Sequence, residues 1–389
     1  MKRVGIIGGG QLAWMMGDAA KKLGVELVVQ TPSSDDPAVA IAHDTVLAKV
    51  DDAISTEIIA QKTDVITFEN EFVNLESLSV IENQGVCFRP RLAALTPLLD
   101  KYNQRCYLQK LGLPVPKFFA LEQPDNLPSQ IEALGFPMVL KSRRHGYDGQ
   151  GTFIIKDLAD LQQKLALNNT NAALSQSLFL IEEFVPFERE LAIIAARSVA
   201  GEVVTYPVVE TQQEQQVCRR VIAPADITPH QAAEIEAIAH TLLNNLQVVG
   251  VFGIELFLTA AGKVLVNEIA PRTHNSGHFS LDACETSQFE QHLRAVCGLP
   301  LGNPALHCAS AVMVNLLGYE ISGSDYQSQR QKLAEIPQAF VHWYGKTESR
   351  PGRKLGHVTV LVDDQNRDAI STIAQTIESI WYPTRKFPY

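Results

Sequence analysis

The stretch GIIGGGQLA, residues 5–13, predicts a strand that runs into a glycine turn and then a helix. Gly8, Gly10 and Ala13 match the G-x-G-x-x-G/A spacing of dinucleotide-binding turns. Such a site also needs an acidic residue at the end of the next strand, where it binds ribose hydroxyls. The next predicted strand, VELVVQTP, instead ends in Gln30. The stretch therefore predicts the start of a doubly wound α/β unit and disfavours a nicotinamide or flavin site.

Composition limits the classes of protein to which the chain can belong. Its 389 residues are 46% hydrophobic and 20% charged, which is typical of a globular protein with two or three domains. The net charge of −10 argues against nucleic acid as a partner, because binding to a phosphate backbone needs a concentrated basic surface. Six cysteines without a C-x-x-C pair, and a start without a signal-peptide pattern, predict a cytoplasmic protein.

The most apolar long stretch, residues 248–266, does not predict a membrane span. It carries Glu255 and Lys263 and has a turn at AAGK, so two strands of a hairpin are the better interpretation. We therefore expect no membrane partner.

The order of predicted elements divides the chain into three parts. Residues 1–97 alternate strands and helices, with a last strand at VCFRP (86–90), and predict a parallel sheet. Functional residues of this part should lie at the carboxyl ends of strands, at GGGQL and TFENE. Residues 98–297 predict an α+β domain rich in antiparallel sheet, and residues 298–389 a small mixed domain.

A glycine-rich segment in the middle part has the composition of a phosphate-binding loop. Lys141 ends the predicted strand FPMVLKS, and GYDGQG follows at residues 146–151. Glycines let the backbone bend over a ligand and point N–H groups at anionic oxygens, while a lysine adds a point charge. A plain hairpin turn is the alternative. The segment is not a Walker loop, because no G-K-[ST] opens a helix.

Two glutamates on neighbouring predicted strands indicate a metal site. Glu255 lies in GIELFL and Glu268 in VLVNEIAPR, with Asn267 beside it. Carboxylates are the oxygen ligands that Mg²⁺ prefers when substrate phosphates complete its coordination. The alternative, Glu255 facing solvent from an edge strand, is disfavoured by NEIAPRTHNSGH (267–278), whose polar residues make poor core. A third segment, LIEEFVPFERE (180–190), reads by itself as a solvated acidic loop, or as a strand that binds adenine and ribose.

Together these motifs resemble the ATP-grasp superfamily. Nearly the whole chain is similar to its purine-biosynthetic branch, the 5-(carboxyamino)imidazole ribonucleotide synthases, through GGGQL, K-S-R-R-x-GYDGQG, GIELF, NEIAPRTHNSGH, HWYGK and RPGRKLGH. The implied fold is α/β and α+β. It has a Rossmann-like pre-ATP-grasp domain (1–97), an ATP-grasp domain with a glycine-rich lid (98–297) and a small C-terminal domain (298–389).

The resemblance also implies a reaction. ATP phosphorylates bicarbonate to carboxyphosphate, and the exocyclic amine of 5-aminoimidazole ribonucleotide then captures the carboxyl group, releasing ADP and phosphate. ATP and Mg²⁺, with Mn²⁺ as an alternative ion, are the implied cofactors, and a homodimer is the implied assembly. Another ATP-grasp ligase, such as a glycinamide ribonucleotide transformylase, is the main alternative. An NAD-dependent oxidoreductase and a nucleotide-binding regulator without catalysis are further alternatives.

Positions within the family motifs imply the site residues. Those expected to bind ATP are Lys101, Lys141, Gly146, Tyr147, Asp148, Gly149, Gln150, Gly151, Thr152, Glu182, Glu183, Phe184, Val185, Glu190, Gln213, Asn267 and Glu268. Those expected to hold the ribonucleotide are Gln11, Leu12, Glu69, Asn275, Lys346, Arg353 and Lys354. The implied catalytic residues are Arg272, His274 and Lys354, and the implied metal ligands are Glu255 and Glu268.

The chain departs from the usual family pattern at a few positions. His145 stands where glycine is usual, Gln150 where a basic residue is common, and Gln213 where a histidine is common. The order TFENEFV leaves open whether Glu69 or Glu71 contacts the ribonucleotide.

Overall fold

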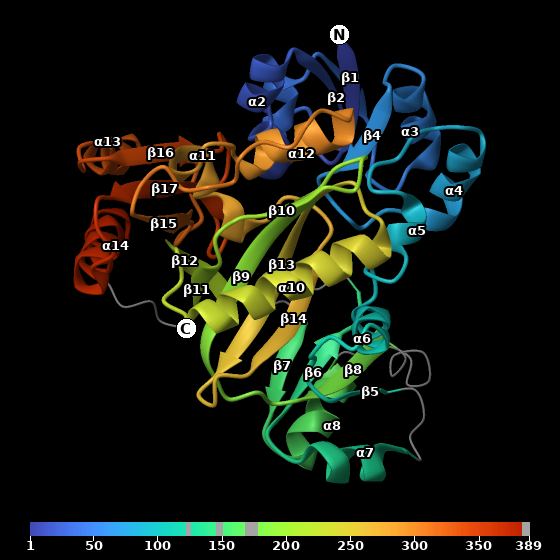
Figure 1. The fold of residues 1–389 in the computed structure, drawn as a ribbon, viewed down its shortest axis with the longest axis vertical. Coiled ribbons are helices and arrows are strands. Elements are labelled where there is room, and N and C mark those ends of the chain that lie inside the picture. Colours follow the sequence, from blue (N-terminus) through green and yellow to red (C-terminus); the bar gives the residue numbers. More distant parts are fainter. Residues whose placement is uncertain (122–125, 145–150, 168–177, 383–389) are drawn as a thin grey trace.

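A computed structural model describes residues 1–121, 126–144, 151–167 and 178–382, and these residues form three sheets (Figure 1). The first sheet is parallel, in the order β3-β2-β1-β4. Its strands are β1 (Lys2–Ile7), β2 (Val25–Thr31), β3 (Asp44–Leu47) and β4 (Val65–Phe68). A parallel sheet is buried on both faces, which explains the continuous apolar runs that the sequence shows here.

Helices surround the first sheet. They are α1 (Gln11–Trp14), α2 (Gly17–Leu23), η1 (Pro37–Ile41), α3 (Ala53–Ala60), α4 (Leu75–Asn83) and α5 (Leu92–Leu95). The side chain of Asp52 caps α3 by accepting the N–H groups of Ile54 and Ser55. The strand expected at residues 86–90 is wrong: only an isolated bridge joins Phe88 to Ile66. Pro90, which has no N–H to donate to a ladder, limits pairing at this point.

The glycine turn after β1 is shaped by the side chains that lie over it. Gly8 has φ = 113°, a backbone conformation that favours glycine. A Cβ at Gly8 or Gly10 would collide with the carboxylate of Glu69, and a Cβ at Gly9 with Thr31. Gly8 and Gly10 therefore leave room for Glu69, which follows β4, and Gly9 leaves room for Thr31.

The second sheet is antiparallel, in the order β5-β8-β6-β7. It consists of β5 (Phe118–Ala120), β6 (Met138–Ser142), β7 (Thr152–Ile155) and β8 (Phe179–Glu183). The helices α6 (Lys101–Lys110), α7 (Leu127–Leu134) and α8 (Leu158–Leu167) lie beside it, in the lower part of Figure 1.

The third sheet is the longest, with the order β14-β13-β9-β11-β12-β15-β17-β16 and β10 paired to β9. Its first strands are β9 (Phe187–Arg197), β10 (Val203–Thr205), β11 (Val209–Glu214), β12 (Val217–Ala223), β13 (Gly250–Thr259) and β14 (Val264–Ala270). Its later strands are β15 (Ser310–Leu317), β16 (Ala339–Trp343) and β17 (Lys354–Val362). Because β12 pairs with β15, one sheet runs across the predicted boundary at residue 297. The boundaries at 97 and 297 stay predictions.

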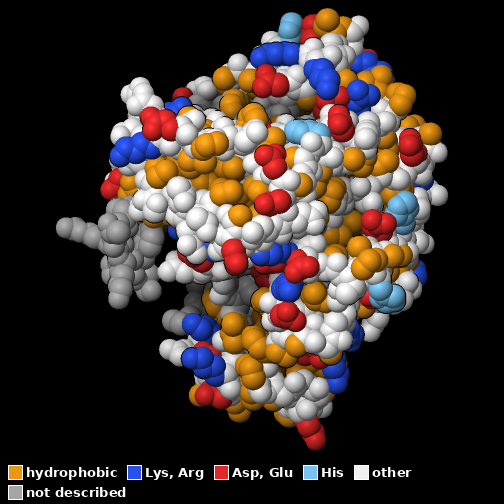
Figure 2. Space-filling view, turned by 60° about the vertical axis from the view of Figure 1, so that its left-hand side comes forward, with side chains coloured by type: hydrophobic (Ala, Val, Ile, Leu, Met, Phe, Trp, Pro, Cys, Tyr) orange, Lys and Arg blue, Asp and Glu red, His pale blue; other side chains and the backbone are white. Residues whose placement is uncertain are grey.

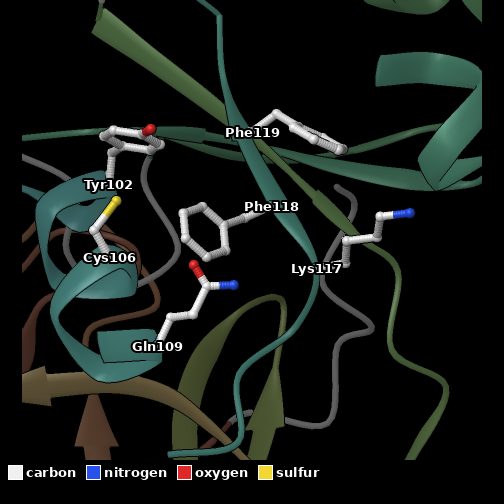
Figure 3. A pocket seen from close by; sticks show the side chains of 6 residues that line it. All are labelled: Tyr102, Cys106, Gln109, Lys117, Phe118 and Phe119. Carbon is white, nitrogen blue, oxygen red and sulfur yellow. The ribbon is translucent and has the colours of Figure 1, made fainter. Parts of the chain in front are cut away.

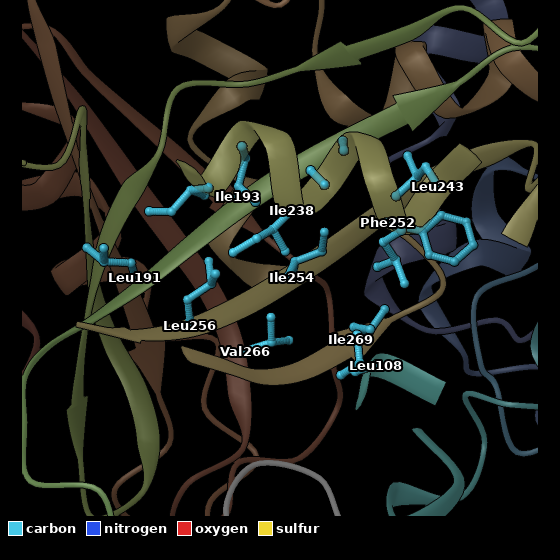
Figure 4. Close-up of a cluster of buried hydrophobic side chains, with 14 of the residues drawn as sticks. Leu108, Leu191, Ile193, Ile238, Leu243, Phe252, Ile254, Leu256, Val266 and Ile269 are labelled. Atoms are coloured by element: carbon cyan, nitrogen blue, oxygen red, sulfur yellow. The ribbon is translucent and has the colours of Figure 1, made fainter. Parts of the chain in front are cut away.

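Helices cover and connect this sheet. α10 (Pro229–Leu246) packs Ile238 and Leu243 against Ile193, Phe252 and Ile254 of the sheet (Figure 4). The remaining elements are η4 (Asn275–Gly277), α11 (Ser280–Ala283), α12 (Gln288–Cys297), α13 (Gln327–Ala334) and α14 (Arg367–Trp381).

α12 joins the long sheet to the first sheet. Its Phe289 and Leu293 belong to the same buried cluster as Val4 of β1. Its His292 bridges the two sheets, because Nε2 lies 2.8 Å from Thr67 Oγ1 and Nδ1 accepts the N–H of Val251 at 3.1 Å. Among the described residues no helix is long and apolar enough to cross a membrane.

Candidate active site

Glu255 and Glu268 lie directly opposite each other on the antiparallel strands β13 and β14. Lys101 Nζ is 2.6 Å from Glu268 Oε2, and His274 Nε2 is 3.4 Å from Glu255 Oε1. The side-chain amide of Asn267 donates to Glu255 Oε2 at 3.4 Å. Burial, together with the charge of Glu268, raises the pKa of Glu255 to about 7. The pair is thus a site of concentrated negative charge that attracts cations.

Lys141 faces this carboxylate pair from the second sheet. Its Nζ lies 2.7 Å from Glu182 Oε2 and 3.0 Å from Asn267 Oδ1. Arg105 binds the same glutamate: its Nε lies 2.5 Å from Glu182 Oε1 and its Nη2 lies 3.3 Å from Oε2. Burial alone would raise the pKa of Glu182, but the charges of Arg105 and Lys141 reverse this and lower it to about 2. Glu182 is therefore a permanent anion that fixes two cations.

Arg105 is a site residue that the sequence motifs did not indicate. It lies four residues after Lys101 on α6, so helical spacing brings the two cations to the same side of the helix. That spacing is the signal that could have identified it.

At the end of β8, Glu183 exchanges two hydrogen bonds with the backbone of Lys117. The N–H of Glu183 donates to the carbonyl of Lys117 at 2.9 Å, and Glu183 Oε1 accepts the N–H of Lys117 at 2.9 Å. Val185 is buried, whereas Phe184 is exposed. On β9, burial raises the pKa of Glu190, and a hydrogen bond from Gln213 opposes the shift. Gln213 thus contacts a predicted ATP residue.

The two acidic residues that the sequence left as alternatives have different partners. Glu69 accepts the backbone N–H groups of Gly10 and Leu12, at the glycine turn, and burial raises its pKa to about 7. Glu71 binds Arg272 in a two-pronged ion pair, in which Nη2 is 2.9 Å from Oε1 and Nε contacts Oε2. Glu69 therefore contacts the glycine turn after β1, whereas Glu71 contacts Arg272, which follows β14 of the long sheet.

Residues after β14 are held by side-chain amides. Asn275 and Asn315 exchange two hydrogen bonds, of 2.9 and 2.8 Å, and both side chains are buried. His274 Nδ1 lies 2.9 Å from Ser276 Oγ, and the N–H of His274 donates to Gln288. The loop is thereby fixed against both β15 and α12.

Of the basic residues in the C-terminal motifs, Lys346 follows β16, and Arg353 and Lys354 lie at the start of β17. Lys346 Nζ donates to the carbonyl of Lys354 at 2.7 Å, and Arg353 Nη1 donates to the carbonyl of Glu348 at 2.7 Å. The charge of Lys354 is close enough to Glu255 to oppose the rise in its pKa. The start of β17 therefore lies near the carboxylates of Glu255 and Glu268.

One pocket among the described residues lies at the glycine turn, and another lies between α6 and β5. One of about 580 Å³ is lined by the glycine turn together with Thr31, Asp36, Lys49 and Glu69. The other, of about 330 Å³, is formed by Tyr102, Cys106 and Gln109 of α6 and by Phe118 and Phe119 around β5 (Figure 3). Its lining contains none of the residues predicted to bind ATP.

The predicted lid lies mostly outside the described residues. Gly146, Tyr147, Asp148, Gly149 and Gln150 are not described, and neither is His145. Gly151 accepts the N–H of Ser142 at 2.7 Å, and Thr152 pairs with Lys141 across β6 and β7. The segment therefore leaves and re-enters the second sheet next to Lys141.

Comparison with known proteins identifies the family. Residues 1–96 match the ribonucleotide synthetase preATP-grasp domain, residues 106–289 the ATP-grasp domain, and residues 311–369 the phosphoribosylaminoimidazole carboxylase C-terminal domain. The N5-carboxyaminoimidazole ribonucleotide synthase of Synechococcus elongatus is 54% identical over 98% of this chain and 96% of its own length. The chain belongs to this family. The synthase of Bacillus subtilis is 36% identical, over 92% of this chain and 91% of its own.

Solved structures of N5-carboxyaminoimidazole ribonucleotide synthases agree with this assignment. An ADP complex has a TM-score of 0.88 at 35% identity and covers 98% of this chain and 97% of its own. The Aspergillus clavatus enzyme in complex with ADP and 5-aminoimidazole ribonucleotide has a TM-score of 0.87 at 30% identity, covering 97% and 98%. The predicted fold class, with its pre-ATP-grasp, ATP-grasp and C-terminal parts, is confirmed, and the chain is an ATP-grasp ligase.

Proposed function

We propose that the chain carboxylates 5-aminoimidazole ribonucleotide with bicarbonate at the expense of ATP, as its family membership indicates. The observation that carries the proposal is the convergence of Lys101 of α6 and Lys354 of β17 on the pair of carboxylates formed by Glu255 and Glu268. Carboxylates can bind a metal ion, and the cations beside them can offset the negative charge of the phosphates.

The reaction has two steps. A bicarbonate oxygen attacks the γ-phosphorus of ATP, the β–γ phosphoanhydride bond breaks, and carboxyphosphate and ADP form. The exocyclic amine of the ribonucleotide then attacks the carboxyl carbon, inorganic phosphate leaves, and the amine loses one proton to give the carbamate. The mixed anhydride hydrolyses readily, so the site must exclude water and hold the amine within attack distance.

ATP would bind between the second and the long sheets. In our proposal Lys101 and Lys141 contact the phosphates, and the glycine-rich segment is the lid that the family resemblance implies. Burial lowers the pKa of Lys141, and the charge of Glu182 opposes this shift. Glu183, Phe184 and Val185 would contact adenine, while Glu190, with Gln213 beside it, would bind the ribose.

Glu255 and Glu268 are the residues that would hold Mg²⁺ or Mn²⁺, with Asn267 beside them. Two carboxylates in register on adjacent strands offer the oxygen donors that these ions prefer. When bound, the ion would neutralise phosphate charge. Lys101 forms an ion pair with Glu268. When ATP binds, this lysine would be shared between the carboxylate and the phosphates.

The ribonucleotide would lie between the glycine turn and the start of β17. Gln11, Leu12, Glu69 and Asn275 would surround the base and ribose, and Lys346, Arg353 and Lys354 the 5′-phosphate. Arg272 would stabilise negative charge on bicarbonate or carboxyphosphate oxygens, and His274 would carry a proton. A cytoplasmic homodimer is part of the proposal and rests on the family resemblance.

The test is ATP turnover by the purified full-length chain. ADP release should require 5-aminoimidazole ribonucleotide, bicarbonate and Mg²⁺ together. Release that depends instead on glycinamide ribonucleotide and formate would support the alternative ligase. Binding of NADH, measured by its fluorescence, would support the alternative of an NAD-dependent oxidoreductase. Sedimentation of the same sample tests the dimer.

A further inference from the structure

Three histidines from the C-terminal motifs gather in one place and have no part in the proposed reaction. His278 ends NEIAPRTHNSGH, His342 opens HWYGK and His357 ends RPGRKLGH. His342 and His357 are register partners on β16 and β17, and their ring centroids are 4.5 Å apart. The ring of His278 is 5.2 Å from that of His357.

An acidic residue completes the cluster from a different element. Asp282 of α11 lies with its two carboxylate oxygens 2.8 and 3.1 Å from His342 Nε2. Asp282, His342 and His357 each offer a ligand atom, and these atoms all lie within 4.8 Å of one another. Ligand atoms this close can converge on one ion once the side chains rotate toward it.

His357 has one ring nitrogen that is left without a hydrogen bond within the described part of the chain. It is fully buried, and its Nδ1 lies 2.8 Å from the hydroxyl of Tyr344. Its Nε2 has no hydrogen-bond partner among the described residues. Buried polar atoms are normally satisfied, so an atom like this one calls for an explanation such as a bound ion. Nδ1 is engaged, so Nε2 is the nitrogen that can coordinate.

A buried histidine cluster that only packs is the simplest alternative. Burial lowers the pKa of both His278 and His357, so these rings are neutral, which is also the form that binds metals. Packing alone leaves Nε2 of His357 unsatisfied, while the hydroxyl of Tyr344 holds its Nδ1. Metal-binding histidines usually have such a partner on their other nitrogen.

We propose that Asp282, His342 and His357 bind a divalent transition-metal ion of the zinc type, separate from the proposed Mg²⁺ site. Two imidazole nitrogens and one carboxylate suit Zn²⁺ or Co²⁺, whereas Mg²⁺ prefers oxygen ligands. Binding displaces any proton held between His342 Nε2 and Asp282. The ring of His342, whose side chain is 24% exposed, turns out of its stack so that both imidazoles face the ion.

The ion would cross-link β16 and β17 to α11. β17 begins with Lys354, and α11 follows the loop that carries Arg272, His274 and Asn275. The site is therefore structural, and the inference does not depend on the proposed reaction.

The experiment uses the untagged full-length chain without ATP, titrated with Co²⁺ and, by calorimetry, with Zn²⁺. The wild type should give the visible absorption of tetrahedral Co²⁺. His342→Ala and Asp282→Asn should lose this absorption. Tyr344→Phe, which removes the outer partner of His357, should weaken Zn²⁺ binding by roughly 10–100-fold. His230→Ala, at an exposed histidine of α10, and Glu268→Gln should leave it unchanged.

Circular dichroism of each variant ensures that a lost signal does not come from unfolding. The proposal is wrong if the wild type shows no tetrahedral Co²⁺ absorption, or if folded His342→Ala and Asp282→Asn keep it. A thiolate charge-transfer band would assign the ion to cysteine and would equally overturn it.

Discussion

Glu71 and Arg272 form a two-pronged ion pair between residues 201 positions apart in the chain. Glu71 follows β4 of the first sheet, and Arg272 follows β14 of the long sheet. Two parallel hydrogen bonds fix the plane of a guanidinium as well as its position. The ion pair therefore fixes the orientation of the Arg272 guanidinium, and we propose that this residue is catalytic.

Glu71→Gln should lower turnover without weakening ATP binding. The amide offers one acceptor in place of two, so Arg272 loses its fixed orientation. We expect kcat to fall by about tenfold or more, which corresponds to about 1.4 kcal/mol in the transition state. The KM for ATP should stay within about twofold, because Glu71 lies outside the phosphate-binding cluster. Glu57→Gln, at an exposed position of α3, is the matched control. Unchanged kcat in Glu71→Gln would show that Arg272 needs no such support.

Glu268→Gln should lose most turnover while the fold survives. The variant removes a proposed metal ligand and leaves Lys101 without its carboxylate partner, but it keeps the shape of the side chain. Steady-state ADP release, measured over a range of Mg²⁺ concentrations, checks this, with Glu236→Gln on α10 as the control. Activity equal to that of the wild type would remove Glu268 from the metal site.

The buried triad of Arg105, Glu182 and Lys141 predicts an order of stabilities. Glu182→Leu leaves two buried cations without their anion and should lower the free energy of unfolding by about 3–5 kcal/mol. Lys141→Met leaves the Arg105 pair intact and should cost less, although it should weaken ATP binding. Urea unfolding of the two variants gives the comparison. The reverse order would contradict the role of Glu182 as the anion that both cations share.

Glu69 should make stability depend on pH. Folding raises its pKa from an ordinary value of 4.5 to about 7, chiefly through burial. Between these values the native state binds more protons than the unfolded state, so the contribution of this carboxyl to the free energy of unfolding falls as pH rises. Glu69→Gln removes the effect and should raise the urea midpoint, relative to wild type, more near pH 8 than near pH 5. A difference that does not change with pH would contradict the shift.

The Asn275 and Asn315 amides should be energetically coupled. Either single change to Ala leaves one buried amide without its partner, at a cost of about 1–3 kcal/mol. The double variant should therefore be less destabilised than the sum of the two, with a coupling of about 0.5–3 kcal/mol in a double-mutant cycle. Additive effects would show that the pair contributes nothing beyond its separate contacts.

Local patterns in the sequence were enough to predict the strands β13 and β14 and the proximity of the carboxylates of Glu255 and Glu268. Alternation of apolar residues in GIELFL and VLVNE predicts two strands joined by the short turn at AAGK, so Glu255 and Glu268 had to lie near each other. The same reasoning placed the glycine turn at the end of β1. It was wrong at residues 86–90, where β propensity did not produce a paired strand.

Contacts between distant segments could not be predicted in this way. Periodicity specifies which face of an element is buried, but not which partner packs there, because that depends on how three sheets and their helices fit together. Only the tertiary structure paired Glu71 with Arg272, gave Glu182 its second cation in Arg105, and brought His357 to Asp282. The sequence by itself determined the elements, the family and the chemical types of the site residues. The packing of the sheets decided which of those residues meet.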